Sequence, residues 1–458
     1  MTPDGPVTSS LGAPTATGAE AAAESRLPRR LGLGSALAVV MGSMIGSGIF
    51  RVPGAVAADT GTIGAMMLAW VVAGLVTLCG ALALAEVAAL FPKVGGLYVY
   101  LHAAYGRLTA FLFGWLILII SPALNAAVAL VFGEYIGRLL SLTPLQVHLT
   151  AAAAIVVVAT SNYRSVSYGA AIQKLTAAAK VTAILALTVA AFVAGQGASA
   201  NWHSDAGLAP RTWGGFGLAL VAVLWAYNGW QDVTYVGGEV REPQRTLPRA
   251  ILGGTLGVML IYLAINAAYV HVLSVGGMAQ SPLVAAEVAV RLVGRAGNAA
   301  IAALVCVSTF GTLNGGLLVF PRVFFAMADD GLFFRKVAAV HPRFGTPHVA
   351  IVLSAVLAVA YLSLRSFEQL IEIAVLGQLP FWALSVGAVL VLRRTLPELP
   401  RPYRSPGYPI VPLLFIAAML ALLANSLREH PESTAWTLGA VLAGIPVYFG
   451  WRQFGARQ

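Results

Sequence analysis

Long apolar segments recur along nearly the whole chain and are separated by short polar stretches. A run of about 20 apolar residues is long enough to cross the hydrocarbon core of a membrane as an α-helix. The pattern therefore predicts an all-α polytopic membrane protein with twelve transmembrane helices. We expect these spans at residues 34–58, 62–91, 107–136, 145–161, 166–195, 215–240, 249–273, 297–326, 348–364, 370–393, 409–427 and 434–451.

Two of the expected spans contain residues that weaken an α-helix. The first span holds Gly46-Ser47-Gly48 within VVMGSMIGSGIFRVPG, and the sixth holds Asn228-Gly229 within LWAYNGWQDVTYVGGEV. A glycine inside a helix costs about 1 kcal/mol relative to alanine. An opened backbone is tolerated at membrane depth only where it is buried in protein or lines a cavity. Both stretches are therefore candidate binding sites.

The positions of the two interruptions predict an internal symmetry. Five spans separate equivalent points, so residues 34–195 and 215–393 form two halves of five helices that face opposite ways. Paired interruptions in corresponding spans of inverted halves are typical of a binding site at the membrane midplane. The fold expected is a five-plus-five inverted repeat with broken helices 1 and 6.

An opened helix suits a zwitterionic ligand. The N–H groups freed at the start of the outer half-helix favour an anion such as a carboxylate, and the carbonyls freed at the end of the inner half-helix favour a cation such as an ammonium. The alternative is that the glycines only allow close helix packing, as small residues do in membranes. We expect that simpler role for Gly253 and Gly257.

Composition and charge support the membrane assignment. The chain is 59% hydrophobic and 10% charged, with a mean hydropathy of +0.82, whereas soluble proteins carry about 25% charged residues. The net charge of +10 does not indicate nucleic-acid binding, because lysine and arginine set the orientation of a membrane protein. Their distribution predicts that both termini of this multi-pass protein lie in the cytoplasm, in a plasma or inner membrane.

The same features divide the chain into three parts. Residues 1–28 are poor in large apolar residues and predict a disordered cytoplasmic tail. Residues 29–395 form the expected core of ten spans. Residues 396–458 add two further transmembrane helices and a short C-terminal tail.

Few polar or reactive side chains lie inside the spans. Lys180 lies in the middle of the fifth span, where a charge costs at least about 2.5–3.5 kcal/mol and usually has a function. Glu86 lies near the inner end of the second span, where an ion pair at the helix end is favoured over a proton-carrying role in symport. Cys79 and Cys306 lie within apolar runs and are expected to be small buried hydrophobic residues rather than a disulfide.

Several motifs in this order resemble a known family. They are GSMIGSGIF in the first span, EVAALFPKVGGLYVYL after the second, LWAYNGW with EVREPQRTLPRAI in the sixth, and STFGTLNGGLLVFPRVFFAMADDG in the eighth. Over about residues 30–450 the chain resembles the amino acid–polyamine–organocation superfamily, and within it the L-type amino acid transporter branch. The resemblance implies the five-plus-five fold with two extra helices, and amino acid transport by alternating access.

The resemblance also implies roles for individual residues. Ile45, Gly46, Ser47 and Gly48 would bind the substrate carboxylate. The substrate amino group and side chain would meet residues of the sixth span and neutral side chains of the third, namely Tyr227, Asn228, Gly229, Asn125 and Ser121. Trp225 matches an aromatic residue that closes over the substrate from outside, although a tryptophan facing lipid or the interface is the alternative.

In the resembling family a lysine at the position of Lys180 replaces the sodium ion of sodium-coupled relatives. It would lie between the first and eighth helices, with Ser308, Thr309 and Thr312 as candidate partners. Two residues depart from the family pattern. Asp232 could carry a proton, face the cytoplasmic vestibule or pair with an arginine of the next loop. Arg51 could simply face external water.

The function that follows is sodium-independent transport of neutral L-amino acids, by exchange or by proton symport. The neutral Asn228 supports this substrate class, because a cationic side chain would need an opposing carboxylate. If Asp232 supplies one, a basic amino acid or polyamine antiporter is the alternative. A nutrient-sensing receptor with the same fold is an alternative of another class. The specific amino acid, the direction of net transport and the oligomeric state stay open.

Other classes and partners are not expected. The His, Asp and Glu residues inside the spans are sparse and without metal-ligand spacing, so we expect no enzyme activity, metal or cofactor. The partners are a small amino acid and the lipid bilayer, and no nucleic acid is expected. The loop between the third and fourth spans, around GRLLSLTPLQ, has no cysteine, so no disulfide-linked glycoprotein partner is expected.

Overall fold

The computed structural model describes residues 26–46, 48–194, 201–202, 213–281, 283–362 and 367–455. The fold is all-α, and its described elements follow in this order: α1 (Leu33–Met44), α2 (Gly48–Thr60), α3 (Ile63–Leu90), α4 (Leu97–Tyr105), α5 (Arg107–Leu140), α6 (Pro144–Arg164), α7 (Val166–Ala194), α8 (Trp213–Tyr227), the 3₁₀ turns η3 (Asp232–Thr234) and η4 (Gly237–Glu239), α9 (Pro243–Val272), α10 (Val275–Gln280), α11 (Val284–Val293), α12 (Arg295–Val319), α13 (Pro321–Asp329), the 3₁₀ turn η5 (Arg335–Ala338), α14 (His348–Tyr361), α15 (Phe367–Thr395), α16 (Ile410–Glu429), α17 (Pro431–Leu442) and α18 (Gly444–Gly455).

Each expected span corresponds to one helix or to consecutive elements: two in the first, eighth and twelfth spans, and α8, η3 and η4 in the sixth. Eight spans among the described residues are long and apolar enough to cross a membrane, and α1 with α2 makes a ninth when this pair, bent by 40°, counts as one. The shorter apolar helices α8 and α14 occupy the positions of the sixth and ninth spans. The chain is therefore a polytopic all-α membrane protein.

Local signals in the sequence explain where the helices begin and end. The α6 helix begins with Pro144 in its first turn, and Thr143 and Gln146 form a capping box at its N-terminus. The α3 helix begins after Thr62, whose hydroxyl accepts the Ala65 N–H. Pro321 has no N–H to continue the hydrogen-bond ladder, and there the eighth span divides into α12 and α13.

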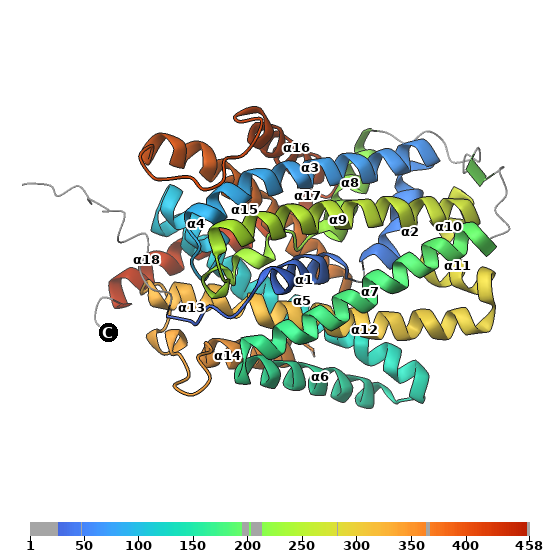
Figure 1. Cartoon of the computed structure of the whole chain (residues 1–458), viewed down its shortest axis with the longest axis horizontal. Coiled ribbons are helices and arrows are strands. Elements are labelled where there is room, and N and C mark those ends of the chain that lie inside the picture. Colours follow the sequence, from blue (N-terminus) through green and yellow to red (C-terminus); the bar gives the residue numbers. More distant parts are fainter. Residues whose placement is uncertain are drawn as a thin grey trace, which may run out of the picture.

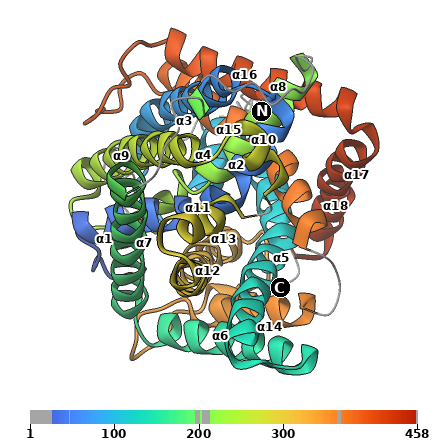
Figure 2. The same cartoon turned by 90° about the vertical axis from the view of Figure 1, so that its right-hand side faces the viewer.

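The helices surround the two broken spans. The α1 helix packs against α7, α9 and α12, and α2 packs against α8 and α10. In Figure 1 the long helices run side by side, with α10 and α11 at one end of the molecule and α4, α13 and α18 at the other. Figure 2 looks along the helices and shows α1 beside α7 and α9. Both breaks are therefore held inside the bundle.

Three features differ from the expected spans. After the break in the sixth span the chain continues as η3 and η4 rather than as a second α-helical half. The short helices α10 and α11 lie in the region that was expected to be a loop between the seventh and eighth spans. The expected tail lies outside the described residues except for 26–28, where Leu27 is 1% exposed and belongs to the packed core.

The ion pair expected for Glu86 is confirmed and is part of a larger cluster. The Glu86 carboxylate accepts hydrogen bonds from Arg393 Nε and Nη2 at 2.9 and 2.7 Å, and its Oε1 lies 3.3 Å from Arg401 Nε. The Ser405 N–H donates to the same carboxylate at 2.7 Å. These contacts join α3 to α15 and to the loop that leads into α16, so the two additional spans are attached to the core through a buried charge.

The short helix α4 is fixed at the same end of the molecule. Tyr98 donates to Asp330 Oδ2 at 2.9 Å, His102 Nδ1 lies 3.3 Å from the same oxygen, and Arg107 Nη2 donates to the Asp330 carbonyl at 2.7 Å. Burial alone would raise the pKa of the Asp330 carboxyl, but the hydrogen bonds from His102 and Tyr98 outweigh it and lower that pKa. The end that carries the N-terminal segment is thus closely tied together.

Candidate functional site

The two breaks lie against each other at the centre of the molecule. The α1 helix ends at Met44 and α2 begins at Gly48. Between them the chain turns at Gly46, whose N–H donates to the Met44 carbonyl at 2.9 Å. The α8 helix ends at Tyr227, and the Asn228 N–H bonds the Trp225 carbonyl at 3.1 Å. Ser47, which was expected to bind the carboxylate, lies outside the described residues.

Glycine is required where the two breaks touch. Gly229 has φ +111°, and a Cβ at this position would lie 2.7 Å from Ser43 Cβ and 2.9 Å from Met44 N. A Cβ on Gly48 would lie 3.0 Å from Ala226 Cα. Both the backbone conformation of Gly229 and these close approaches exclude larger residues.

A tyrosine on a neighbouring helix ties the two opened ends together. The Tyr262 hydroxyl on α9 lies 2.7 Å from the Met44 carbonyl and 3.1 Å from the Ala226 carbonyl, within hydrogen-bond distance of both. These carbonyls belong to the last turns of α1 and α8, which have no helical partner of their own. Sequence analysis did not single out Tyr262, because its only signal is a polar atom within an otherwise apolar helix.

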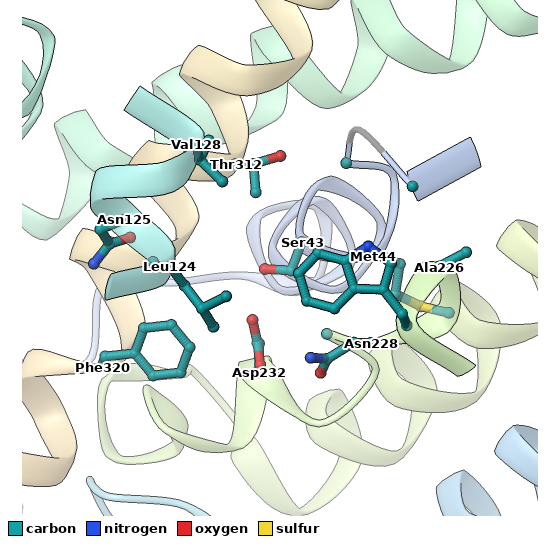
Figure 3. A pocket seen from close by; sticks show the side chains of 15 residues that line it. Ser43, Met44, Leu124, Asn125, Val128, Ala226, Asn228, Asp232, Thr312 and Phe320 are labelled. Atoms are coloured by element: carbon teal, nitrogen blue, oxygen red, sulfur yellow. The ribbon is translucent and has the colours of Figure 1, made fainter. Parts of the chain in front are cut away.

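The breaks line a cavity of about 90 Å³. Its wall combines backbone from both breaks with side chains of α5 and α12, and Figure 3 shows these side chains arranged around the space. The lining residues are Ser43, Met44, Gly46, Gly48, Leu124, Asn125, Val128, Trp225, Ala226, Asn228, Gly229, Asp232, Thr312, Gly316 and Phe320.

Most of the residues expected to bind the substrate line this cavity. They are Gly46, Gly48, Asn125, Trp225, Asn228 and Gly229, and Asp232, which was expected as a coupling residue, lines it too. Leu124, Val128 and Phe320 form an apolar wall that sequence analysis did not identify, because nothing distinguishes these residues from other apolar residues of the spans. Ser43, Met44, Ala226 and Gly316 were also not identified.

Three of the expected residues lie elsewhere. The Ile45 side chain is buried in the hydrophobic core. The Tyr227 ring points away from the cavity and packs on Trp70 and Tyr262, with ring centroids 6.0 and 5.2 Å apart. Its hydroxyl donates to the Trp70 carbonyl at 3.5 Å. Ser121 is fully buried on α5 but does not line the cavity.

Lys180 lies beside the cavity, between α1 and α12. Its Nζ donates to the Gly42 carbonyl at 3.0 Å and to Thr312 Oγ1 at 3.2 Å, and the residue is 0% exposed. Gly42 is in the last turn of α1, where the helix dipole favours a cation. Thr312 also lines the cavity and lies beside Gly46, so its hydroxyl lies between the buried cation and the break.

The other candidate partners of Lys180 are arranged differently. Thr309 bonds back to the Val305 carbonyl at 2.7 Å, and the Ser308 carbonyl accepts from the Thr312 hydroxyl at 3.0 Å. Neither hydroxyl of Ser308 or Thr309 reaches Lys180 among the described contacts. Of the three hydroxyl residues, Thr312 is the one that lies level with Lys180 along α12.

Asp232 faces the cavity rather than a loop arginine. It lies on η3, is 6% exposed, and Figure 3 shows its carboxylate directed toward Ser43 and the space between Leu124 and Asn228. Arg245, in the first turn of α9, lies 4.0 Å from Glu242 instead. Arg51 lies on α2, is partly exposed and is not among the lining residues.

The described residues offer no alternative metal chemistry. They contain no group of three or more His, Cys, Asp or Glu side chains that could hold a metal ion. Cys79 and Cys306 are both free. The arrangement as a whole can bind a small zwitterion, because it places freed backbone groups of both signs around one cavity.

Comparison with known proteins agrees with this arrangement. Residues 31–447 match the family described as amino acid permease. The serine/threonine exchanger SteT of Bacillus subtilis is 35% identical over 438 residues, which cover 94% of this chain and 98% of SteT. The human b(0,+)-type amino acid transporter 1 is 30% identical, covering 93% and 90%, and the human large neutral amino acids transporter small subunit 2 is 32% identical, covering 92% and 80%. These relatives are transporters and not enzymes.

Proposed function

This chain belongs to the amino acid permease family, and we propose that it exchanges small neutral L-amino acids across the membrane without sodium. The observation that carries the proposal is the cavity of about 90 Å³ bounded by both helix breaks. It is lined by backbone groups that suit the two charges of an amino acid and by an apolar wall that suits an uncharged side chain. Alternating access would carry the substrate across.

The substrate orientation follows from the helix dipoles. The carboxylate would lie at the start of α2, near Gly48, where N–H groups without helical partners favour an anion. The ammonium would lie near the end of α1 and the Asn228 amide, whose oxygen already accepts from Gln231 Nε2 at 3.0 Å and has a second lone pair. Trp225 lines the cavity from α8, which packs on α2, and would cover the bound substrate.

Size and polarity of the wall support a small neutral side chain. The cavity is smaller than the roughly 150 Å³ cavity that holds benzene in an engineered protein core, and Leu124, Val128 and Phe320 carry no charge. A relative that is 35% identical is by name a serine/threonine exchanger, which supports both the small substrate and the exchange mode.

Sodium independence rests on Lys180. Its ammonium group occupies the space between α1 and α12 with two neutral acceptors, Gly42 O and Thr312 Oγ1. A covalently attached cation stabilises these acceptors in every step of the cycle, whereas a bound ion could leave. Exchange needs only this fixed charge. Proton symport would require Lys180 or Asp232 to change its protonation state during the cycle.

Location and partners complete the proposal. The protein would lie in the plasma or inner membrane with both termini in the cytoplasm, because lysines and arginines gather in the loops on that side. It would work without a disulfide-linked partner, since its two cysteines lie within α3 and α12.

Exchange is tested by uptake of labelled alanine into proteoliposomes. We expect rapid uptake when the vesicles contain unlabelled alanine or serine, little uptake into empty vesicles, and no change when potassium replaces sodium. Uptake into empty vesicles driven by an inward proton gradient would show symport instead. Specific binding without uptake under any of these conditions would contradict transport and favour the receptor alternative.

Asp232 supports a second candidate, transport of basic amino acids. A carboxylate that faces the cavity could neutralise a cationic side chain. Competition decides between the candidates: we expect unlabelled alanine and serine to inhibit labelled alanine uptake at least tenfold more strongly than lysine or arginine. Strong inhibition by arginine that disappears in Asp232→Asn would overturn the neutral assignment and identify the residue responsible.

Lys180→Ala should slow exchange at least tenfold in protein that still folds. The substitution leaves the Gly42 carbonyl without its donor and removes the link between α1 and α12. Lys174→Ala is the matched control, because Lys174 is an exposed lysine on the same helix. Exchange by Lys180→Ala at the rate of the control would show that the buried cation has no part in transport.

A further inference from the structure

A short N-terminal segment crosses the end of the molecule that lies opposite α10 and α11. Residues 26–31, which we call the strap, run directly into α1. Leu31 forms a parallel bridge with Val240, and the Arg241 N–H donates to the Leu31 carbonyl at 2.8 Å. Leu27 and Leu31 are each 1% exposed. The strap is therefore packed into the protein.

Glu239 holds this strap through its backbone. The N–H groups of Arg30 and Leu31 both donate to the Glu239 carbonyl, at 2.8 and 2.9 Å. Glu239 is the last residue of η4, which follows η3 and the cavity-lining Asp232. The strap is thus bonded to the continuation of the sixth span just beyond the break.

Glu239 also holds α13, through its side chain. Arg322 Nε lies 2.9 Å from Glu239 Oε1, and Arg322 Nη2 lies 3.3 Å from Oε2. Both side chains are 0% exposed. Arg322 follows the cavity-lining Phe320 by two residues, so this ion pair joins the two elements that continue from the cavity toward the end of the molecule that carries the strap.

The strap is attached not only to η4 but also to α13. Arg26 forms an ion pair with Asp329, and its guanidinium lies 5.7 Å from the centre of the Phe325 ring. Pro28 lies against Gly345 of the loop before α14. The strap, η4 and α13 therefore close this end of the molecule together.

A buried ion pair is a suitable device for a closure that must open. Burying two charges is costly, so an ion pair stabilises a closed state little more than apolar residues of similar volume would. When such a junction separates and admits water, both charged groups become hydrated, whereas separated apolar surfaces would be exposed unfavourably. In the closed state the two charges neutralise each other, and in the open state water hydrates each of them.

We propose that Glu239 is the latch of a gate that closes the strap-bearing end of the substrate cavity. Its side chain binds Arg322 on α13, and its carbonyl binds the strap that leads into α1. Opening toward this side requires the Glu239–Arg322 pair to separate. The inference rests on the proposed function insofar as the cavity is the transport site.

The test measures access to the cavity without transport. In a variant with Cys79 and Cys306 replaced by alanine, Ser43→Cys places one thiol in the cavity wall. A membrane-impermeant thiol reagent is applied separately to the two membrane faces in oriented vesicles. We expect Glu239→Gln to raise the labelling rate from the face that carries the N-terminus at least fivefold and to lower the rate from the other face.

The control is Glu242→Gln, three residues further on, whose carboxylate is exposed and only 4.0 Å from Arg245. It should leave both labelling rates unchanged. Unchanged rates in folded Glu239→Gln would overturn the proposal, and so would an equal rise from both faces, which would mean general loosening. If Glu239→Gln does not fold, Arg322→Lys, which retains the charge but loses the two-point geometry, should give at least a twofold rise on the same face only.

The same experiment separates this inference from the proposed function. The predicted labelling in a protein that does not exchange amino acids would support the gate and contradict the function. Normal exchange by Glu239→Gln together with unchanged labelling would support the function and contradict the gate.

Discussion

Two helices that open in the middle of a membrane expose peptide groups that lipid cannot hydrate, and much of this structure serves to satisfy them. The last carbonyls of α1 and α8 share the Tyr262 hydroxyl, and the Gly42 carbonyl receives the Lys180 ammonium. The α7, α9 and α12 helices pack around α1 and supply or support these donors. The groups left over, at the start of α2 and around Asn228, line the cavity. On the proposed function, the substrate would satisfy the backbone groups that the fold leaves without a partner.

The same constraint explains why the site is joined to both ends of the molecule. The α2 helix packs on α8 and α10 at one end, and a Cβ on Gly54 would meet the Ser281 carbonyl at 2.6 Å. At the other end η4, α13 and the strap meet at Glu239. A segment that is opened at its centre can move its two halves independently. On the proposed gate, the contacts at either end would determine which side of the cavity is accessible. The charged contact at Glu239 differs in kind from the close backbone approach at Gly54.

The features that sequence analysis predicted are those that polarity alone determines. Glycines in an apolar run and a lysine at mid-span are unfavourable in lipid unless they have a use, so Gly46, Gly48, Asn228, Gly229 and Lys180 could be selected from the pattern. Features that depend on how a helix is rotated or shifted against its neighbours could not be predicted from the sequence. Adjacent residues on a helix point about 100° apart, and the end of α8 turns Asn228 into the cavity and Tyr227 toward Trp70. Ser308, Thr309 and Thr312 are chemically similar, and only the offset of α12 along α7 places Thr312 at the depth of Lys180. The Glu239–Arg322 pair joins residues 83 positions apart, and neither residue reveals its partner in the sequence.

The central claim is that the opened ends of the first and sixth spans form the amino acid site. A structure determined with bound alanine tests it most directly. The account predicts that the alanine carboxylate lies within about 3 Å of N–H groups at the start of α2, with its ammonium between the end of α1 and Asn228. Alanine bound in any other part of the molecule, with the space between the two breaks occupied by solvent, would contradict the account.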